Sequence, residues 1–425
     1  MTRSPIGRTP AFGRGGDKGG GKPNWLGDDA PSVVRRSLDK GERIRLGMVG
    51  GGVDAFIGTV HRHAAALDHR YDLVAGALSS TPERSRESGL ALGLAEDRCY
   101  ADYAAMAERE ARRYDGIHAV SVVTPNHMHL PAAVPFLKRG IHVICDKPLC
   151  TSLADAEAFA EVVRDAPARF FLTHNYTGYP MVRQAREMVA AGELGEIRVV
   201  QVEYAQDWMT TAVETAGLKQ AEWRTDPARS GAGGSIGDIG THAHNLAGFV
   251  TGLRAEELAA DLQSFGAGRR LDDNAHIMLR YEGGARGMLW CSQVAPGNEN
   301  GLRLRVYGSD GGLEWSQEDP NHLYFTKEGE PPRLIRRNGA GSSPGSAAVS
   351  RVPAGHPEGY LEGFANLYTG IADTLFAVTN HRRPPDESAL LPGIEAGLDG
   401  MRFIDACVRS DEANAGWVGL VARAV

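Results

Sequence analysis

The stretch that decides the fold is IRLGMVGGGVDAFIG, which spans residues 44–58. Its apolar beginning, residues 44–49, predicts a buried strand, and a glycine-rich turn then leads into a helical pattern at residues 58–67. Glycines let the backbone approach a pyrophosphate closely, while the N-terminus of a helix offers N–H donors and partial positive charge. A turn of this kind between a strand and a helix predicts a dinucleotide site, with Gly50 and Gly52 as cofactor-binding residues.

This turn departs from the strict pattern Gly-x-Gly-x-x-Gly. The third glycine of the pattern would stand at residue 55, where the chain has Ala55, so we expect Gly58 to be the glycine of the cofactor site that also lets the helix pack closely. A purely structural glycine turn is the alternative. The position between strand and helix favours the cofactor site.

The rest of the chain predicts an α/β fold with two domains. Apolar runs at residues 73–78, 119–123 and 141–145 alternate with helical stretches, which indicates a dinucleotide-binding Rossmann domain over residues 43–173. Strand patterns without crossover helices then follow one another, which indicates a large, mainly antiparallel open sheet in a second α/β domain, residues 174–425. One of the late helical patterns is expected to pack back on the first domain.

The end of the second strand bears on the choice between NAD and NADP. NAD-binding folds usually place an acid there for the ribose 2′-hydroxyl, whereas this chain has Ser79, Ser80 and, further along, Arg84. These residues could hold a 2′-phosphate, but Arg84 could equally be a solvated helix residue. The sequence therefore predicts NAD or NADP and leaves the choice open.

Two further strand ends carry polar side chains. Lys147 follows the run 141–145, and Thr124, Pro125, Asn126 and His129 follow the run 119–123. Because the carboxyl ends of parallel strands form the binding edge of such a sheet, we expect these residues near a nicotinamide ribose. A strand-ending turn and a solvated lysine are the structural alternatives.

A second glycine-rich segment, residues 231–242, contains Asp238 and His242 four residues apart. On a helix the two share one face, so the aspartate could orient the imidazole. Oxidation of a secondary alcohol needs a base for the hydroxyl proton, a role that histidine suits, while Lys147 would polarise the reacting oxygen. A satisfied core histidine is one alternative; a metal site with His244 is another, but His242 and His244 would diverge on a helix.

Composition narrows the class of protein. Over 425 residues the chain is 42% hydrophobic and 23% charged with a net charge of −7, which fits a globular protein and gives no reason to expect a nucleic-acid partner. No apolar run is long enough to predict a membrane span. The five cysteines are scattered, so we expect neither disulfides nor a thiolate metal site, and a cytoplasmic location. Residues 1–42 read as a flexible arm with a helix at 31–38.

With these motifs the chain resembles the Gfo/Idh/MocA oxidoreductases over about residues 43–410. Asp146-Lys147-Pro148 stands where the family has Glu-Lys-Pro, residues 124–129 match Thr-Pro-Asn-x-x-His, and residues 233–242 match Gly-Gly-x-x-x-Asp-x-Gly-x-His. The resemblance implies a catalytic group of Lys147, Asp238 and His242. It also implies a second domain whose sheet often mediates oligomerisation, hence a homodimer or homotetramer.

The resemblance places further residues at the site. Asp146 replaces the usual glutamate of the cofactor site, and the longer glycine loop brings Phe56 and Ile57 to positions that flank the pyrophosphate. Residues 174–180 and 355–360 are similar to sugar-processing members. The substrate is therefore expected at Lys147, Asn175, Tyr176, Trp223, Arg224, Asp238 and His242, since aromatic faces and bidentate donors suit a polyol, although Trp223 could be core.

The function expected from these residues is hydride transfer between NAD or NADP and a secondary hydroxyl or keto carbon of a sugar, glycoside or cyclitol. A glycosidase that oxidises the sugar, eliminates the aglycone and reduces the product again would use the same site. A non-catalytic dinucleotide sensor is a third possibility, but it would not need an acid/base pair.

Overall fold

The structure is a computed structural model that describes residues 38–39, 41–215 and 219–420. The expected N-terminal arm and its helix therefore lie outside the described residues, apart from the last few positions. Among these, Leu38 is buried in a cluster with Ile44 and Tyr71. No described helix is long and apolar enough to cross a membrane.

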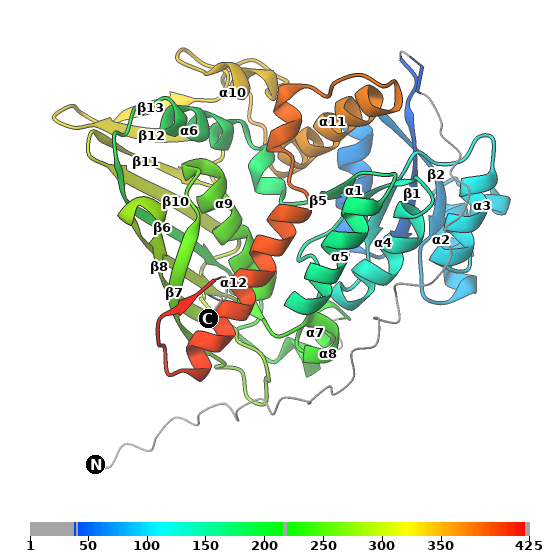
Figure 1. Cartoon of the computed structure of the whole chain (residues 1–425), viewed down its shortest axis with the longest axis horizontal. Helices are drawn as coiled ribbons and strands as arrows, with labels where there is room; N and C mark the ends of the chain where they lie inside the picture. The colour runs from blue at the N-terminus through cyan, green and yellow to red at the C-terminus, as the bar shows by residue number, and fades with distance from the viewer. Residues whose placement is uncertain (1–37, 40, 216–218, 421–425) are drawn as a thin grey trace.

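The first part of the chain forms a parallel sheet with strand order β2-β1-β3-β4-β5 (Figure 1). The strands are β1 (Ile44–Gly50), β2 (Tyr71–Ala77), β3 (Ala119–Val123), β4 (His142–Cys145) and β5 (Phe170–Leu172). The helices between them are α1 (Phe56–Leu67), α2 (Pro82–Ala91), α3 (Tyr103–Arg112), α4 (His129–Leu137) and α5 (Leu153–Asp165). The order reverses beside β1, and such a reversal opens a crevice at the carboxyl ends of the strands. The predicted Rossmann sheet is confirmed.

The N-terminus of α1 lies at this crevice and has no side-chain cap. The helix begins at Phe56, two residues before the predicted start at residue 58, and its N-cap residue Ala55 makes no side-chain hydrogen bond to it. By contrast, the side chains of Asp102 and Ser152 cap α3 and α5. The first N–H groups of α1 thus keep their donor capacity beside the glycine turn.

The second part of the chain forms a nine-stranded sheet with order β13-β12-β11-β10-β6-β9-β8-β7-β14. Its strands are β6 (Ile197–Ala205), β7 (Ala255–Gln263), β8 (Asn274–Tyr281), β9 (Arg286–Ser292), β10 (Gly301–Gly308), β11 (Gly311–Ser316), β12 (His322–Lys327), β13 (Arg333–Arg336) and β14 (Val418–Gly419). Only the β6–β9 pairing is parallel among those described, so the predicted mainly antiparallel sheet is confirmed.

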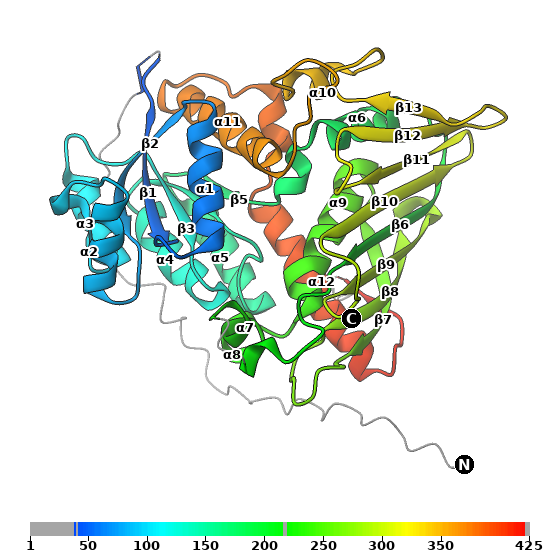
Figure 2. The ribbon, with the colours of Figure 1, turned by 180° about the vertical axis from the view of Figure 1, so that it is seen from behind.

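Helices of the second part cover one face of this sheet. Figure 1 and Figure 2 both show α6 (Pro180–Ala190), α9 (Thr241–Thr251) and α12 (Ile394–Glu412) between the two sheets, while no described helix covers the outer face of the larger one. Two short helices, α7 (Lys219–Arg224) and α8 (Pro227–Ser230), lie near the first sheet. The two sheets thus face each other across a layer of helices.

The long helix α11 (Tyr360–Thr379) returns to the first sheet and packs against α1. Inside this contact the His61 ring nitrogen Nδ1 lies 2.7 Å from the Tyr368 hydroxyl, which also lies 2.8 Å from the Ser121 hydroxyl. Both His61 and Tyr368 are fully buried. The contact therefore joins α11 to the centre of the first sheet.

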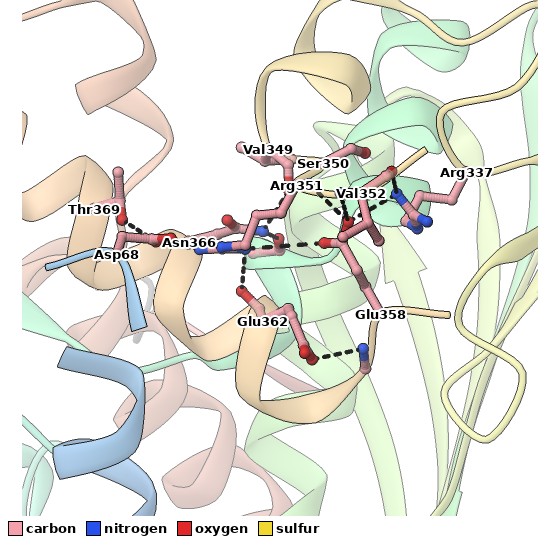
Figure 3. Close-up of polar contacts among 12 residues, drawn as sticks. Asp68, Arg337, Val349, Ser350, Arg351, Val352, Glu358, Glu362, Asn366 and Thr369 are labelled. Atoms are coloured by element: carbon pink, nitrogen blue, oxygen red, sulfur yellow. Dashed lines mark hydrogen bonds and ion pairs between the residues drawn. The ribbon is translucent and has the colours of Figure 1, made fainter. Parts of the chain in front are cut away.

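The irregular segment before α11 adds a polar strap between the two parts (Figure 3). Arg351 donates two hydrogen bonds to Asp68 at the end of α1 and one to the Glu362 carbonyl in α11. The carboxylate of Glu358 accepts the Arg351 backbone N–H at 2.7 Å and pairs with the buried Arg337 at 2.8 Å. The strap thus connects α1 with the strand β13 side of the second sheet and helps to fix the relative position of the sheets.

Candidate active site

A cavity of about 1310 Å³ lies where the carboxyl edge of the first sheet meets the second part of the chain. Small-molecule pockets usually measure roughly 300–1000 Å³, so this cavity can hold a dinucleotide together with a small substrate. Most of the expected site residues line it: Gly50, Gly52, Phe56, Ile57, Ser79, Ser80, Arg84, Thr124, Pro125, Asn126, Asp146, Lys147, Asn175, Tyr176, Trp223, Arg224, Asp238 and His242.

The glycine turn forms one wall. Gly50 has φ 76°, and a Cβ added there would lie 2.9 Å from the Val123 carbonyl oxygen. Gly58 does not line the cavity, because it packs against Gly51, where an added Cβ would lie 2.4 Å from the Gly51 Cα. The turn and the uncapped start of α1 therefore offer backbone donors at close range, which fits a dinucleotide pyrophosphate.

At the far end of this wall, the hydroxyls of Ser79 and Ser80 lie after β2, as predicted. Arg84 lies there too, but its side chain is 58% exposed and its guanidinium stands 3.9 Å from the carboxylate of Asp54. Asp54 belongs to the glycine turn and was not among the expected residues. NAD-binding folds usually have an acid directly after β2, and this chain has none there. The carboxylate of Asp54 lines the same end of the cavity.

At the centre of the cavity, an ion pair between Lys147 and Asp238 connects the first part of the chain with the second. The Lys147 ammonium donates to the Asp238 carboxylate at 3.0 Å and to the Asp238 carbonyl at 2.6 Å. Gln293 donates to the other carboxylate oxygen at 2.9 Å. The guanidinium of Arg224 lies 3.5 Å from the oxygen that Lys147 binds. Burial alone would raise the pKa of Asp238, but the cations of Arg224 and Lys147 outweigh it and hold this pKa well below its usual value.

The expected partnership of Asp238 and His242 is not what the structure contains. Asp238 lies in a π-helical turn, Ile236–Gly240, which precedes α9. The described hydrogen bonds of its carboxylate go to Lys147 and Gln293, and the Nδ1 of His242 has no described partner. The carboxylate of Asp238 instead interacts with the cations of Lys147 and Arg224 and with the amide of Gln293. It therefore positions the ammonium of Lys147 and not the imidazole of His242.

The His242 ring lies at the floor of the cavity and is only 7% exposed. The rings of Tyr176 and His174 pack edge-on against it, with centroids 4.9 Å and 5.5 Å away. Burial, and then the nearby Lys147 cation, lowers the pKa of His242 well below its usual value. The imidazole is therefore neutral near pH 7 and able to accept a proton.

The polar residues after β3 divide into two groups. Thr124, Pro125 and Asn126 line the cavity, and Asn126 also donates to the Ser230 carbonyl at 3.0 Å, which holds α8 over the site. His129 does not reach the cavity: it is 1% exposed and its ring nitrogens lie 2.8 Å and 2.9 Å from the carbonyls of Pro148 and Thr124. The prediction of a cofactor contact there is wrong, because burial turns this histidine into a link between two loops.

The cofactor-side carboxylate, Asp146, is fixed from two directions. It accepts the Thr173 hydroxyl at 2.8 Å and the backbone N–H of Lys147 at 3.0 Å. The Nε2 of His61 stands 4.0 Å from the same oxygen. Although aspartate is shorter than the glutamate of the family motif, its side chain still lines the cavity.

Polar side chains that the sequence did not indicate complete the substrate end. The Tyr204 hydroxyl donates to Asn300 at 2.7 Å and lies 2.6 Å from the Tyr176 hydroxyl. Gln206 donates to the same Asn300 oxygen at 3.0 Å and accepts the indole N–H of Trp208 at 3.1 Å. The run Gln206-Asp207-Trp208, directly after β6, is the signal that could have found part of this wall.

The sequence also left open a metal site made of Asp238, His242 and His244. His244 has its own partner, because its Nε2 lies 2.8 Å from the Asp399 carboxylate. Within the described residues there is no group of three or more His, Cys, Asp or Glu side chains arranged to hold a metal ion.

Comparisons with known proteins agree with this fold. Residues 44–174 match the oxidoreductase family with an NAD-binding Rossmann fold, and residues 182–314 match the GFO/IDH/MocA C-terminal domain. The uncharacterized oxidoreductase YfiI of Bacillus subtilis is 35% identical over 89% of this chain and 98% of its own length. A crystal structure of an oxidoreductase from Sinorhizobium meliloti is 57% identical over 88% of this chain and 99% of that one, with a TM-score of 0.80. An inositol dehydrogenase homolog from Azotobacter vinelandii, complexed with NADH and myo-inositol, is 40% identical over 90% of this chain and 99% of that one, with a TM-score of 0.82.

The position of Asp54 leads to a prediction about the cofactor. A 2′-phosphate near Ser79 and Ser80 would be repelled by this carboxylate, so NAD⁺ should bind more tightly than NADP⁺. Asp54→Asn should narrow the ratio of the two dissociation constants by roughly two- to fivefold, a modest factor because solvent and salt screen both exposed side chains. Titration calorimetry with both cofactors measures it, with Asp97→Asn on the protein surface as control. An unchanged ratio would rule out this role of Asp54.

Proposed function

Because the chain belongs to the Gfo/Idh/MocA oxidoreductase family, we propose that it is an NAD-dependent dehydrogenase that oxidises a secondary hydroxyl of a cyclic polyol to the ketone. The family assignment itself makes the protein an oxidoreductase with an NAD-binding Rossmann domain. The observation that carries the proposal is the Lys147 ammonium, fixed on Asp238 beside the neutral imidazole of His242, in a cavity that also contains the glycine turn.

The proton chemistry belongs to His242. Its Nδ1 is shut off from solvent, so Nε2 is the nitrogen that can face a substrate hydroxyl. In the oxidising direction Nε2 accepts the hydroxyl proton while the carbon loses a hydride, and the nicotinamide ring supplies the hydride acceptor when the cofactor is bound. In the reducing direction the imidazolium returns the proton to the ketone oxygen.

Lys147 stabilises charge on the reacting oxygen. An ammonium group has three N–H donors, and Asp238 takes two of them with its carbonyl and its carboxylate. The third donor remains for the substrate oxygen, where negative charge develops as the proton leaves. Asp238 therefore acts as a positioning residue, because it holds the ammonium in place and balances its charge.

A cyclic polyol fits the remaining walls. Asn300, Gln206 and the Tyr176 and Tyr204 hydroxyls can exchange hydrogen bonds with several ring hydroxyls, and the Trp208 and Trp223 rings offer apolar faces to the C–H side of such a ring. The Azotobacter homolog is complexed with myo-inositol, and a levoglucosan dehydrogenase is 26% identical over 66% of this chain. Cyclitols are therefore our first choice, with sugars second.

A panel of cyclitols, sugars and aryl glycosides, followed by nicotinamide absorbance, tests this function. We expect NAD⁺ reduction with at least one cyclitol or sugar and no aglycone release; aglycone release without net NAD⁺ reduction would instead indicate a redox-assisted glycosidase. Lys147→Met and His242→Asn should each lower kcat by about 10²–10⁴-fold, as expected for loss of charge stabilisation or of a general base. Both variants should still bind NAD⁺, and Arg383→Gln in an exposed ion pair serves as the control. Near-wild-type turnover in either variant would refute its role.

The bare outer face of the nine-stranded sheet is our proposed contact between copies of the chain. Large apolar side chains lie on it in three cross-strand pairs, each pair with partners directly opposite in neighbouring strands. These pairs are Met278 with Met288, Val199 with Tyr307 and Tyr324 with Leu334, and all six side chains are at least 36% exposed. The three pairs place large apolar side chains on six strands of one face, and exposed apolar side chains gathered in this way indicate a contact with another protein surface.

Sedimentation velocity tests this contact. The wild type should sediment as a multiple of its 45.5 kDa mass, whereas the double variant Met278→Glu/Tyr324→Glu should shift to the monomer, because buried carboxylates in the contact are costly. Tyr114→Glu, a fully exposed tyrosine outside the sheet, is the matched control. A monomeric wild type at micromolar concentration, or an unchanged double variant, would contradict the contact.

A further inference from the structure

His242 stands at one end of a row of buried histidines. The His174 ring lies edge-on to it, with a centroid distance of 5.5 Å and an interplanar angle of 85°. His174 follows β5 and is 2% exposed, and His244, two residues after His242 in α9, is 5% exposed. None of the functions proposed above uses His174 or His244.

Each of the three rings has a nitrogen without a protein partner. The Nδ1 atoms of His242, His174 and His244 are buried and make no described hydrogen bond. Buried polar atoms are nearly always hydrogen-bonded, either to protein or to ordered water. The rings of His174 and His242 are in contact, and His244 lies close enough to His174 to act on its pKa. Buried water at these three nitrogens would connect the rings.

The outer end of the row reaches the surface. The Nε2 of His244 lies 2.8 Å from a carboxylate oxygen of Asp399 in α12, and the His244 ring stacks on Phe403 with a centroid distance of 4.6 Å. The Asp399 side chain is 53% exposed, whereas the His244 side chain is 5% exposed. The row therefore leads from the floor of the cavity to bulk water on the α12 side.

Charged groups at both ends of the row, Lys147 at the cavity and Asp399 at the surface, act on the pKa of His174. Burial, followed by the charges of Lys147 and His244, lowers its pKa to about 3, while Asp399 and Asp146 act in the opposite direction. A neutral imidazole has one N–H and one free lone pair, so it can accept a proton on one side and donate from the other. Other titratable or charged groups also lie beside the row. The rings of Tyr176 and Tyr204 lie against His242, while Arg402 and Tyr281 interact with Asp399.

On the basis of the dehydrogenase function above, we propose that His174, His244 and Asp399 form a proton route that carries the proton accepted by His242 to bulk water. Each oxidation of R₂CH–OH by NAD⁺ gives R₂C=O, NADH and one proton. With cofactor and substrate in the cavity, the imidazole of His242 is covered from that side. Its Nε2 takes the hydroxyl proton, its Nδ1 releases one toward His174, and the transfer continues through His244 to Asp399, which releases one proton to water.

Exchange of ring protons with water tests the route without any substrate. In protein with ¹⁵N-labelled histidine and bound NAD⁺, the ring N–H protons of His174 and His242 should exchange about tenfold more slowly in Asp399→Asn, because an amide cannot take up the proton. His174→Phe, which keeps a ring in place, should slow the exchange at His242. Asp405→Asn, on the same helix and in a half-buried ion pair with Arg409, is the matched control and should match the wild type. Wild-type exchange in both Asp399→Asn and His174→Phe would overturn the route.

Turnover provides the second readout, with myo-inositol as the probe or, if it is inactive, the best substrate of the panel. Asp399→Asn should lower kcat about tenfold, less than loss of the base itself, with unchanged KM values and a larger solvent deuterium isotope effect. Unchanged kcat and isotope effect would contradict a role in catalysis. If no polyol is oxidised while exchange still depends on Asp399, the dehydrogenase function fails and the proton route remains.

Discussion

The active site depends on one largely buried carboxylate, Asp238, which joins the two parts of the chain. Asp238 belongs to the second part of the chain, yet it receives the ammonium of Lys147 from the end of β4 and the amide of Gln293 from beyond the end of β9. A buried carboxylate without such partners would be costly, whereas here two cations and an amide keep it ionised. The contact therefore determines where the ammonium lies, and with it the place of the reacting oxygen.

The rest of the fold holds the two sides of this contact in position. Parallel strands bring Lys147, the residues after β3 and the glycine turn to one edge of the first sheet. Helix α11 and the Arg351 strap join α1 to the second part, and α9 carries His242 to the floor of the cavity. Because His242 is buried and close to the Lys147 cation, it stays neutral, and a neutral base next to a cation is what oxidation of an alcohol requires.

Sequence patterns predict those parts of the structure that depend on neighbouring residues. The buried strands β3 and β4 read as continuous apolar runs, and the glycine turn, Lys147 and His242 follow from motifs of fixed spacing. Strand β7, with the sequence AEELAADLQ, was not predicted because its glutamates and alanines favour a helix, and pairing with β8 overrides that preference. Gln293, Asn300 and the partner of His129 depend on contacts between distant segments, which spacing does not reveal. The π-helical turn likewise changes the partner of Asp238 although the motif itself is intact.

The pH dependence of NAD⁺ reduction tests most directly whether the Lys147 cation sets the state of His242. Oxidation needs the neutral imidazole, so kcat/KM should be constant through neutral pH and fall only at pH values below the ordinary histidine pKa of ~6.5. In Lys147→Met the midpoint of this fall, measured on the residual activity, should move upward because the cation is gone, while burial should keep it below ~6.5. A midpoint at or above ~6.5 in the wild type, or one that Lys147→Met leaves in place, would contradict the arrangement.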